Sequence, residues 1–142
     1  MTIMGQDAPL SFSGIDHIGI AVADLEAATR LWRDTLSLPF KGIEEIPEQK
    51  VKVAIFEVGG TRIELLAPTA ADSPIAKFLV HQGEGLHHIA LRTGNCQAAL
   101  EELEKRGMLL LDKEARSGAE GTRIGFLHPQ SLRGVLVEIT ER

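Results

Sequence analysis

The chain has 142 residues, of which 44% are hydrophobic and 25% charged, and its formal net charge is −5. These values are typical of one globular domain and exclude a disordered tail, a coiled coil and a collagen-like chain. The acidic balance and an aromatic content of 4% argue against a nucleic-acid partner. The single cysteine, Cys96, cannot form an intrachain disulfide and favours a reducing compartment.

The first residues lack the features of a targeting segment. Residues 1–14 show no basic start followed by an apolar run, as a signal peptide would. No stretch approaches the ~20 apolar residues of a membrane span. We therefore expect a cytoplasmic protein with no membrane partner, in which residues 1–13 are an N-terminal extension of a single domain over residues 14–142.

The first half of the domain, residues 14–69, is predicted to form a β-α-β-β-β module. Its first strand is expected at residues 16–22, and Asp24 is suited to cap the helix that follows and continues to Leu36. A tight turn at Gly59 and Gly60 separates the last two strands. The three strands after the helix are expected at residues 40–46, 51–58 and 61–67.

The second half repeats this order at an offset of 71 residues. His17 then corresponds to His88, and Asp24 corresponds to Asn95, which is also a good N-cap. A helix linking the halves is predicted over residues 72–83, because a capping residue and a proline stand at its start. The second module, residues 86–141, is expected to have strands at 87–93, 108–112, 122–128 and 134–140 and a helix from Asn95 to about Gly107. The fold class is therefore α+β, with two tandem βαβββ modules.

Strand alternation selects four polar residues. In the first strand of each module, His17 and His88 lie opposite the apolar face, which carries residues such as Ile89. In the last strand of each module, Glu64 and Glu138 hold the equivalent position, with an offset of 74. A carboxylate in the middle of an apolar strand is costly unless a metal or another charge satisfies it.

Two imidazoles and two carboxylates suit a divalent metal that keeps open positions. The alternative is that each histidine is a hydrogen-bonded structural residue and each glutamate faces solvent. The repeat favours a shared metal site, because each pair occupies equivalent places in the two halves. His87, on the opposite face from His88, and Cys96, near a helix start, are interpreted as structural.

Five parts of the chain together carry a family resemblance: residues 16–22, 47–51, 63–68, 72–79 with 85–90, and 126–130 with 134–138. They resemble the vicinal oxygen chelate superfamily, which includes glyoxalase I and the extradiol dioxygenases, and within it the methylmalonyl-CoA epimerases. The resemblance spans nearly the whole chain after the first dozen residues, and it implies that the modules form a curved mixed-sheet cup.

Carried over by position, the metal ligands of this family fall on the four residues that alternation selects, His17, Glu64, His88 and Glu138. Some epimerases have Gln where this chain has Glu64. The resemblance implies Glu138 as one catalytic base and Glu64 as a candidate for the other. A second glutamate base that some epimerases carry falls on Val53 here, so that base cannot be carried over.

The activity that the resemblance implies is interconversion of (R)- and (S)-methylmalonyl-CoA, by proton abstraction alpha to the thioester through a metal-chelated enolate. The cofactor is then a divalent ion, with cobalt, nickel, manganese, zinc and magnesium all open. An acyl-CoA substrate, methylmalonyl-CoA or ethylmalonyl-CoA, and a homodimer are the expected partners. Candidates to bind the anionic CoA are Lys77, Arg92, Arg116 and Arg123.

Two other functions stay open. Glyoxalase I also moves a proton next to a carbonyl at a metal site, and the two-His, two-Glu set permits it. A metal-free small-molecule binding protein of the same fold is the other, although it would need none of the four ligands. An iron oxygenase is less favoured, because it typically uses two histidines and one carboxylate.

Overall fold

The computed structural model describes residues 10–142, which divide into two compact units. One unit is His17–His87, and the other joins the described residues up to Asp16 with His88–Arg142. Most of the predicted N-terminal extension, residues 1–9, lies outside the described residues. Within residues 10–142, none of the helices combines the length and apolar character needed to span a membrane.

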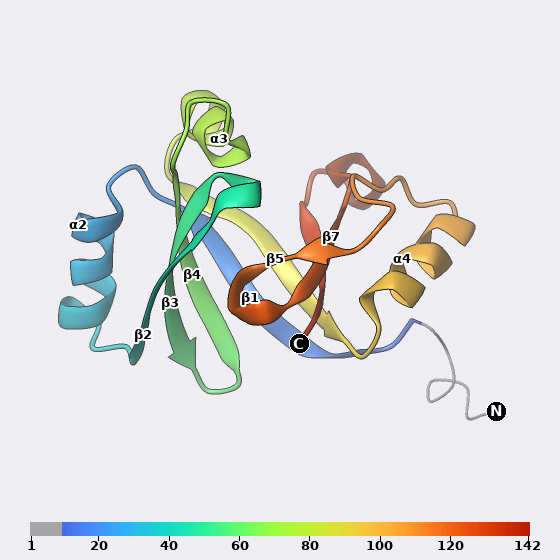
Figure 1. The fold of residues 1–142 in the computed structure, drawn as a ribbon, viewed down its shortest axis with the longest axis horizontal. Helices are drawn as coiled ribbons and strands as arrows, with labels where there is room; N and C mark the ends of the chain where they lie inside the picture. The colour runs from blue at the N-terminus through green and yellow to red at the C-terminus, as the bar shows by residue number, and fades with distance from the viewer. Residues whose placement is uncertain (1–9) are drawn as a thin grey trace. The chain divides into compact units, whose positions relative to one another are not determined.

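The unit His17–His87 holds a four-stranded sheet in the order β2-β3-β4-β1, with helix α2 beside it (Figure 1). Strand β1 pairs with β4 in parallel, whereas β2, β3 and β4 form antiparallel pairs. A short helical turn, Pro47–Gln49, connects β2 to β3. The elements are β1 (Phe12–Ala21, from His17 onward in this unit), α2 (Leu25–Arg30), β2 (Phe40–Ile46), β3 (Val51–Val58), β4 (Thr61–Pro68) and α3 (Pro74–Gln82).

Both helices of this unit begin where the sequence predicts. The Asp24 carboxylate accepts a hydrogen bond from the Ala27 amide at 3.0 Å, which caps α2. The Ser73 hydroxyl accepts one from the Ile75 amide at 3.1 Å, which caps α3. The first helix does continue toward Leu36, but its second part, Leu31–Thr35, is a π-helix rather than an α-helix.

The core of this unit lies between α2 and one face of the sheet. Alternation along β3 and β4 turns Ala54, Phe56 and Leu65 toward the helix, and all three are fully buried. Trp32, the only tryptophan of the chain, packs against this cluster from the π-helix. The other face of the sheet carries His17 from β1 and Glu64 from β4, beside buried apolar residues such as Val53.

The second unit repeats the arrangement, with a sheet in the order β5-β8-β7-β6 and helix α4 packed on β7 and β8 (Figure 1). Strands β5 and β8 are parallel, as β1 and β4 are in the other unit. The core joins α4 to the sheet through Leu100, Leu127 and Ile139. The elements are β5 (Gly85–Thr93, from His88 onward in this unit), α4 (Cys96–Lys105), β6 (Arg116–Ser117), β7 (Arg123–Leu127) and β8 (Val137–Glu141), with short helical turns at Ala119–Gly121 and Pro129–Leu132.

The predicted α+β class with two βαβββ modules is confirmed, but the strand predicted at residues 108–112 is wrong. Leu110 makes only an isolated bridge to Leu127, and the two-residue strand β6 takes the edge position instead. The Phe126 amide donates to the carboxylate of Asp112 at 2.9 Å instead of to a backbone carbonyl. A side chain thus replaces the ladder partner that a strand would need there.

Two smaller predictions, about where the last strand begins and about the burial of Ile89, are also wrong. The last strand begins at Val137 rather than residue 134, because the turn Pro129–Leu132 and the positive φ of Gly134 occupy the preceding residues. Ile89, predicted to face the core, is 37% exposed. The apolar face of β5 is therefore only partly covered within this unit.

Candidate metal and catalytic residues

The unit His17–His87 contributes one buried pair, His17 and Glu64. In the register of β1 and β4, Gly19 stands opposite Glu64, and a glycine there leaves room for the imidazole and the carboxylate on one face. His17 Nδ1 lies 3.5 Å from Glu64 Oε2, and the two residues are only 5% and 4% exposed. The pair lies on the face of the sheet opposite helix α2, as the alternation predicts.

The second unit contributes the equivalent pair, His88 and Glu138. Here Ala90 stands opposite Glu138 in the register of β5 and β8, the same small-residue position that Gly19 holds in the first unit. His88 Nε2 lies 3.2 Å from Glu138 Oε1, and the two residues are 6% and 4% exposed. Each unit therefore holds one histidine next to one glutamate.

Glu138 is further oriented by a residue that the sequence analysis missed. The buried Thr140 hydroxyl donates a hydrogen bond to Glu138 Oε2 at 2.6 Å, so both carboxylate oxygens have a near neighbour. Strand alternation could have predicted this contact. Thr140 lies two residues after Glu138 on the same strand, and therefore on the same face. Phe126 packs edge-on against His88 at 5.3 Å between ring centroids and holds the imidazole in place.

The separations within the pairs fit metal ligation. Two ligand atoms, each ~2.1 Å from one ion and at right angles, lie ~3 Å apart, and a tetrahedral angle widens this to ~3.4 Å. The observed 3.5 Å and 3.2 Å lie close to that range. His17, His88 and Glu138 are each buried, and each offers a ligand atom of a kind that binds metal ions. The mixture of imidazole and carboxylate does not single out one divalent metal.

Val53, the position onto which the second family base would fall, lies on the same face of its sheet as Glu64. Strand β3 pairs Ile55 with Glu64, and Val53 is two residues away along the same strand. Val53 is 1% exposed. Its side chain therefore adds an apolar wall beside the carboxylate and no proton acceptor.

A second charged group lies in the unit that holds Glu138. Asp16 is fully buried, and both of its carboxylate oxygens accept hydrogen bonds from Arg142 at 2.9 Å. Arg92 donates a further one at 2.9 Å. These contacts with Asp16 raise the pKa of the Arg142 guanidinium above its ordinary value. The two arginines satisfy a buried charge, which indicates a structural role.

The other histidines and the cysteine do not join the two pairs. The ring of His87 packs edge-on against Phe78 of α3 at 4.9 Å, and the His128 Nδ1 accepts from the Gln130 amide at 3.0 Å. His81 is exposed at the end of α3. Cys96 is fully buried, and burial, reinforced by Glu141, raises the pKa of its thiol to about 12. The thiol is thus neutral, and the helix start does not favour its thiolate.

Three of the four cations considered for CoA have partners within the protein. Arg92 binds Asp16, Arg116 binds Asp112 at 3.0 Å, and Arg123 donates to the Ala115 carbonyl at 2.9 Å. Arg116 also stacks over Phe126 at 5.8 Å. Lys77 is exposed on α3. These contacts do not assign a CoA site.

Comparison with known proteins gives consistent matches. A family model described as the Glyoxalase/Bleomycin resistance protein/Dioxygenase superfamily matches residues 16–126. An uncharacterized Bacillus subtilis protein, YqjC, is 42% identical over 89% of this chain and 91% of its own. The mitochondrial methylmalonyl-CoA epimerase of Mus musculus is 38% identical over 89% of this chain and 72% of its own.

The solved structures agree with the sequence relatives. A methylmalonyl-CoA epimerase in complex with methylmalonyl-CoA and NH4+ is similar to this chain with a TM-score of 0.89 and 38% identity, over 92% of this chain and 95% of that one. The resemblance predicted from the sequence is therefore confirmed. The chain belongs to the Glyoxalase/Bleomycin resistance protein/Dioxygenase superfamily, and methylmalonyl-CoA epimerases are among its relatives.

Proposed function

We propose that this chain is a metal-dependent epimerase that interconverts (R)- and (S)-methylmalonyl-CoA. The observation that carries the proposal is the buried histidine–glutamate pair found in each module, at equivalent strand positions. Relatives that are methylmalonyl-CoA epimerases support the substrate class, and one of them is solved with methylmalonyl-CoA bound. Glutamate and histidine at these positions provide both metal ligands and proton acceptors.

The proposal assigns one divalent ion to the four residues His17, Glu64, His88 and Glu138. The ion would supply Lewis-acid stabilisation of the negative charge that develops on the thioester oxygen. Burial of the four side chains supports this assignment, because a carboxylate at this depth needs a strong compensating charge. The identity of the ion stays open between cobalt, nickel, manganese, zinc and magnesium.

Glu138 is the proposed base for one stereoisomer. Its carboxylate takes the proton from the carbon between the thioester and the free carboxylate, and the C–H electron pair moves onto the thioester carbonyl. Inversion requires that a proton return to the opposite face of that carbon. We assign that return to Glu64, whose equivalent place in the other module makes it the natural second acid. In the reverse reaction the two glutamates exchange roles.

The test is NMR of methylmalonyl-CoA in deuterium oxide, with the metal-loaded protein. We expect the α-proton signal to disappear with the wild-type protein, and the Glu138→Gln variant to lower the exchange rate by ~100-fold or more. The control is Glu114→Gln, which changes an exposed glutamate outside the site and should exchange at the wild-type rate. Full exchange with Glu138→Gln would remove Glu138 from the role of base.

The same samples separate the other substrates and functions. Ethylmalonyl-CoA differs by one methylene, so its rate relative to methylmalonyl-CoA defines the acyl specificity. Activity on the hemithioacetal of methylglyoxal and glutathione, with none on methylmalonyl-CoA, would assign glyoxalase I instead. A protein that retains no metal and has no metal-dependent activity would be a binding protein. The homodimer stays a prediction from the family resemblance, and sedimentation of the purified chain tests it.

A further inference from the structure

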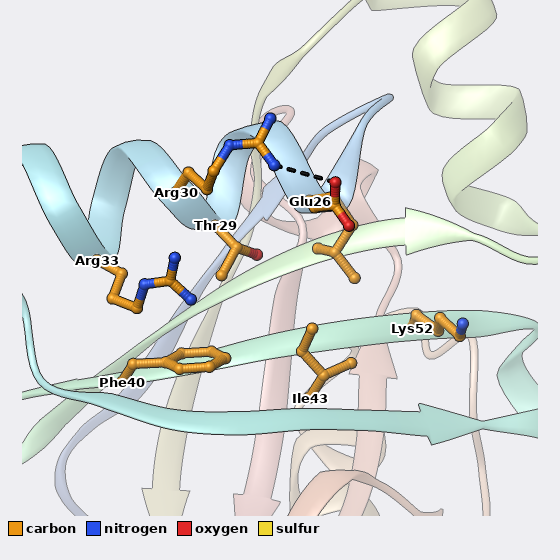
Figure 2. Close-up of a pocket in the computed structure, with 8 residues that line it drawn as sticks. Glu26, Thr29, Arg30, Arg33, Phe40, Ile43 and Lys52 are labelled. Carbon is orange, nitrogen blue, oxygen red and sulfur yellow. Dashed lines mark hydrogen bonds and ion pairs between the residues drawn. The ribbon is translucent and has the colours of Figure 1, made fainter.

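A cavity of about 720 Å³ lies in the unit His17–His87, between helix α2 with its π-helical extension and strands β2 and β3 (Figure 2). It is on the face of the sheet away from His17 and Glu64, because Lys52 and Ile43 pair with residues on the helix side. The cavity is therefore separate from the proposed catalytic residues. Its apolar lining comes from Leu25, Phe40 and Ile43.

The charged lining of the cavity is mainly positive. It holds Arg30, Arg33 and Lys52 against a single carboxylate, Glu26, in a chain whose net charge is −5. Arg30 pairs with Glu26 at 3.0 Å, as Arg33 pairs with Asp34. Of the two arginines, Arg33 is the one whose side chain reaches from the helix toward the strands, and Lys52 lies on β3 (Figure 2).

Arg33 and Lys52 can each contact an anion that is bound in the cavity. Figure 2 shows Arg33 reaching from the helix toward Phe40, and its guanidinium lies 5.8 Å from that ring. It also pairs with the exposed Asp34 at 2.8 Å. Lys52 makes no ion pair in the part of the chain that the structure describes, although Glu45 stands opposite it on β2. An ammonium and a guanidinium thus flank the apolar floor.

Thr29 supplies an independent indication of a ligand. It is 4% exposed and lines the cavity, yet within residues 10–142 its hydroxyl has no hydrogen-bond partner. A buried hydroxyl normally finds an acceptor or donor, and threonine in a helix usually bonds a carbonyl of the preceding turn. A ligand oxygen in the cavity would satisfy it.

The helix itself changes form beside this cavity. Arg33 belongs to the π-helix Leu31–Thr35, in which the Leu36 amide donates to the Leu31 carbonyl at 3.0 Å. Single π-helical turns are rare and are found frequently at functional sites. Arg33 extends from this turn over Phe40, and its side chain is 42% exposed.

We propose that this cavity binds a small amphipathic organic anion, one with an apolar ring or branched chain and a single carboxylate or phosphate. The apolar part would lie against Leu25, Phe40 and Ile43. The anionic group would accept hydrogen bonds from Arg33 and the Thr29 hydroxyl beside Phe40, whereas Lys52 lies at the other end of the apolar floor (Figure 2). This site does not depend on the proposed epimerase activity, because it uses none of the four metal-site residues.

Phenylacetate is the probe, and its uncharged amide and inorganic phosphate are the comparisons. Titration followed by amide NMR should show saturable shifts at the residues of α2, β2 and β3. Phenylacetate should bind at least ~5-fold more tightly than phenylacetamide or phosphate, since binding needs both a charge and an apolar body. Arg33→Gln should weaken phenylacetate by ~5-fold, whereas Lys52→Gln, which alters the cation at the other end of the floor, should weaken it by less than ~2-fold.

Thr29→Val distinguishes a ligand site from a structural hydroxyl. The variant keeps the branched shape and removes the unsatisfied oxygen, so its melting temperature should rise while its affinity for phenylacetate falls. Glu114→Gln, far along the chain, should change neither. Shifts that do not saturate, equal binding of the three compounds, or an unchanged affinity in the Arg33 variant would overturn the proposal.

Discussion

At the scale of single residues, the hydrogen bonds of two buried groups, the Glu138 carboxylate and the Cys96 thiol, determine how each group behaves. Glu138 has the imidazole of His88 near one oxygen and the Thr140 hydroxyl on the other, whereas the Cys96 thiol donates only weakly to the Ile139 carbonyl at 3.4 Å. The first arrangement holds a charged acceptor in one orientation. The second keeps a thiol neutral and unreactive.

Thr140 should act on the reaction through Glu138. Thr140→Val removes the hydrogen bond to Glu138 Oε2 but keeps the side-chain shape, so we expect the α-proton exchange rate to fall by ~10-fold. Exchange is measured by NMR in deuterium oxide, alongside the affinity for the metal. The matched control is Thr93→Val, which alters another buried strand threonine of the same unit. Equal losses in both variants would show that Thr140 has only a packing role.

Cys96 should make the free energy of unfolding depend on pH in the alkaline range. Its pKa is about 12 in the folded protein against 9.0 for an ordinary cysteine thiol, so the folded state holds the proton more tightly. The stabilisation is complete below about pH 9 and is lost as pH rises toward the folded pKa. Urea unfolding should show ~1 kcal/mol less stability at about pH 10 than at about pH 8. Cys96→Ala should lack this component, and an identical pH profile in that variant would contradict the assignment.

At the scale of elements, strand pairing places every residue of the two histidine–glutamate pairs. Alternation within strands and the repeat at an offset of 71 residues are enough to select His17 and His88, because both signals are local. The strand predicted at residues 108–112 fails for a non-local reason, since the Asp112 carboxylate occupies the Phe126 amide. The π-helix could not be predicted either, because no residue type marks a one-residue widening of a helix.

The buried carboxylate of Asp16 on β1, with its two arginine partners, gives a prediction at the scale of elements. Asp16→Asn leaves Arg92 and Arg142 without a counter-charge for their hydrogen bonds, and we expect a loss of ~2 kcal/mol in unfolding free energy. The loss is below that of a fully buried pair because both arginines are partly exposed. Glu102→Gln breaks the exposed pair with Arg106 and should cost less than ~0.5 kcal/mol. Similar losses in the two variants, measured by urea denaturation, would count against a buried ionic role for Asp16.

At the scale of the whole molecule, the two modules have the same element order and the same polar pair, yet neither carries four ligands. Each has one imidazole and one carboxylate on the face opposite its helix. Two ligands from one module would hold a hydrated divalent ion weakly, whereas four satisfy it. The proposed function thus requires both halves of the chain.

This requirement fixes the metal stoichiometry. We expect one ion per chain of 142 residues after loading with cobalt and dialysis, measured by elemental analysis. Loading should raise the melting temperature, since the ion binds the folded state alone, and a chelator should reverse the rise. His17→Ala and His88→Ala should each abolish the effect, although they alter different modules. Two ions per chain, or a variant that keeps full binding, would rule out the shared site.

The positions of two rare residues make the modules separately visible in solution. The only tryptophan, Trp32, packs in the core of His17–His87, and the only cysteine, Cys96, is buried in the other unit. Indole fluorescence therefore reports the opening of the first module, and thiol accessibility reports the opening of the second. A single untreated chain, without any introduced label, can thus show whether its two halves melt as one cooperative unit or in sequence.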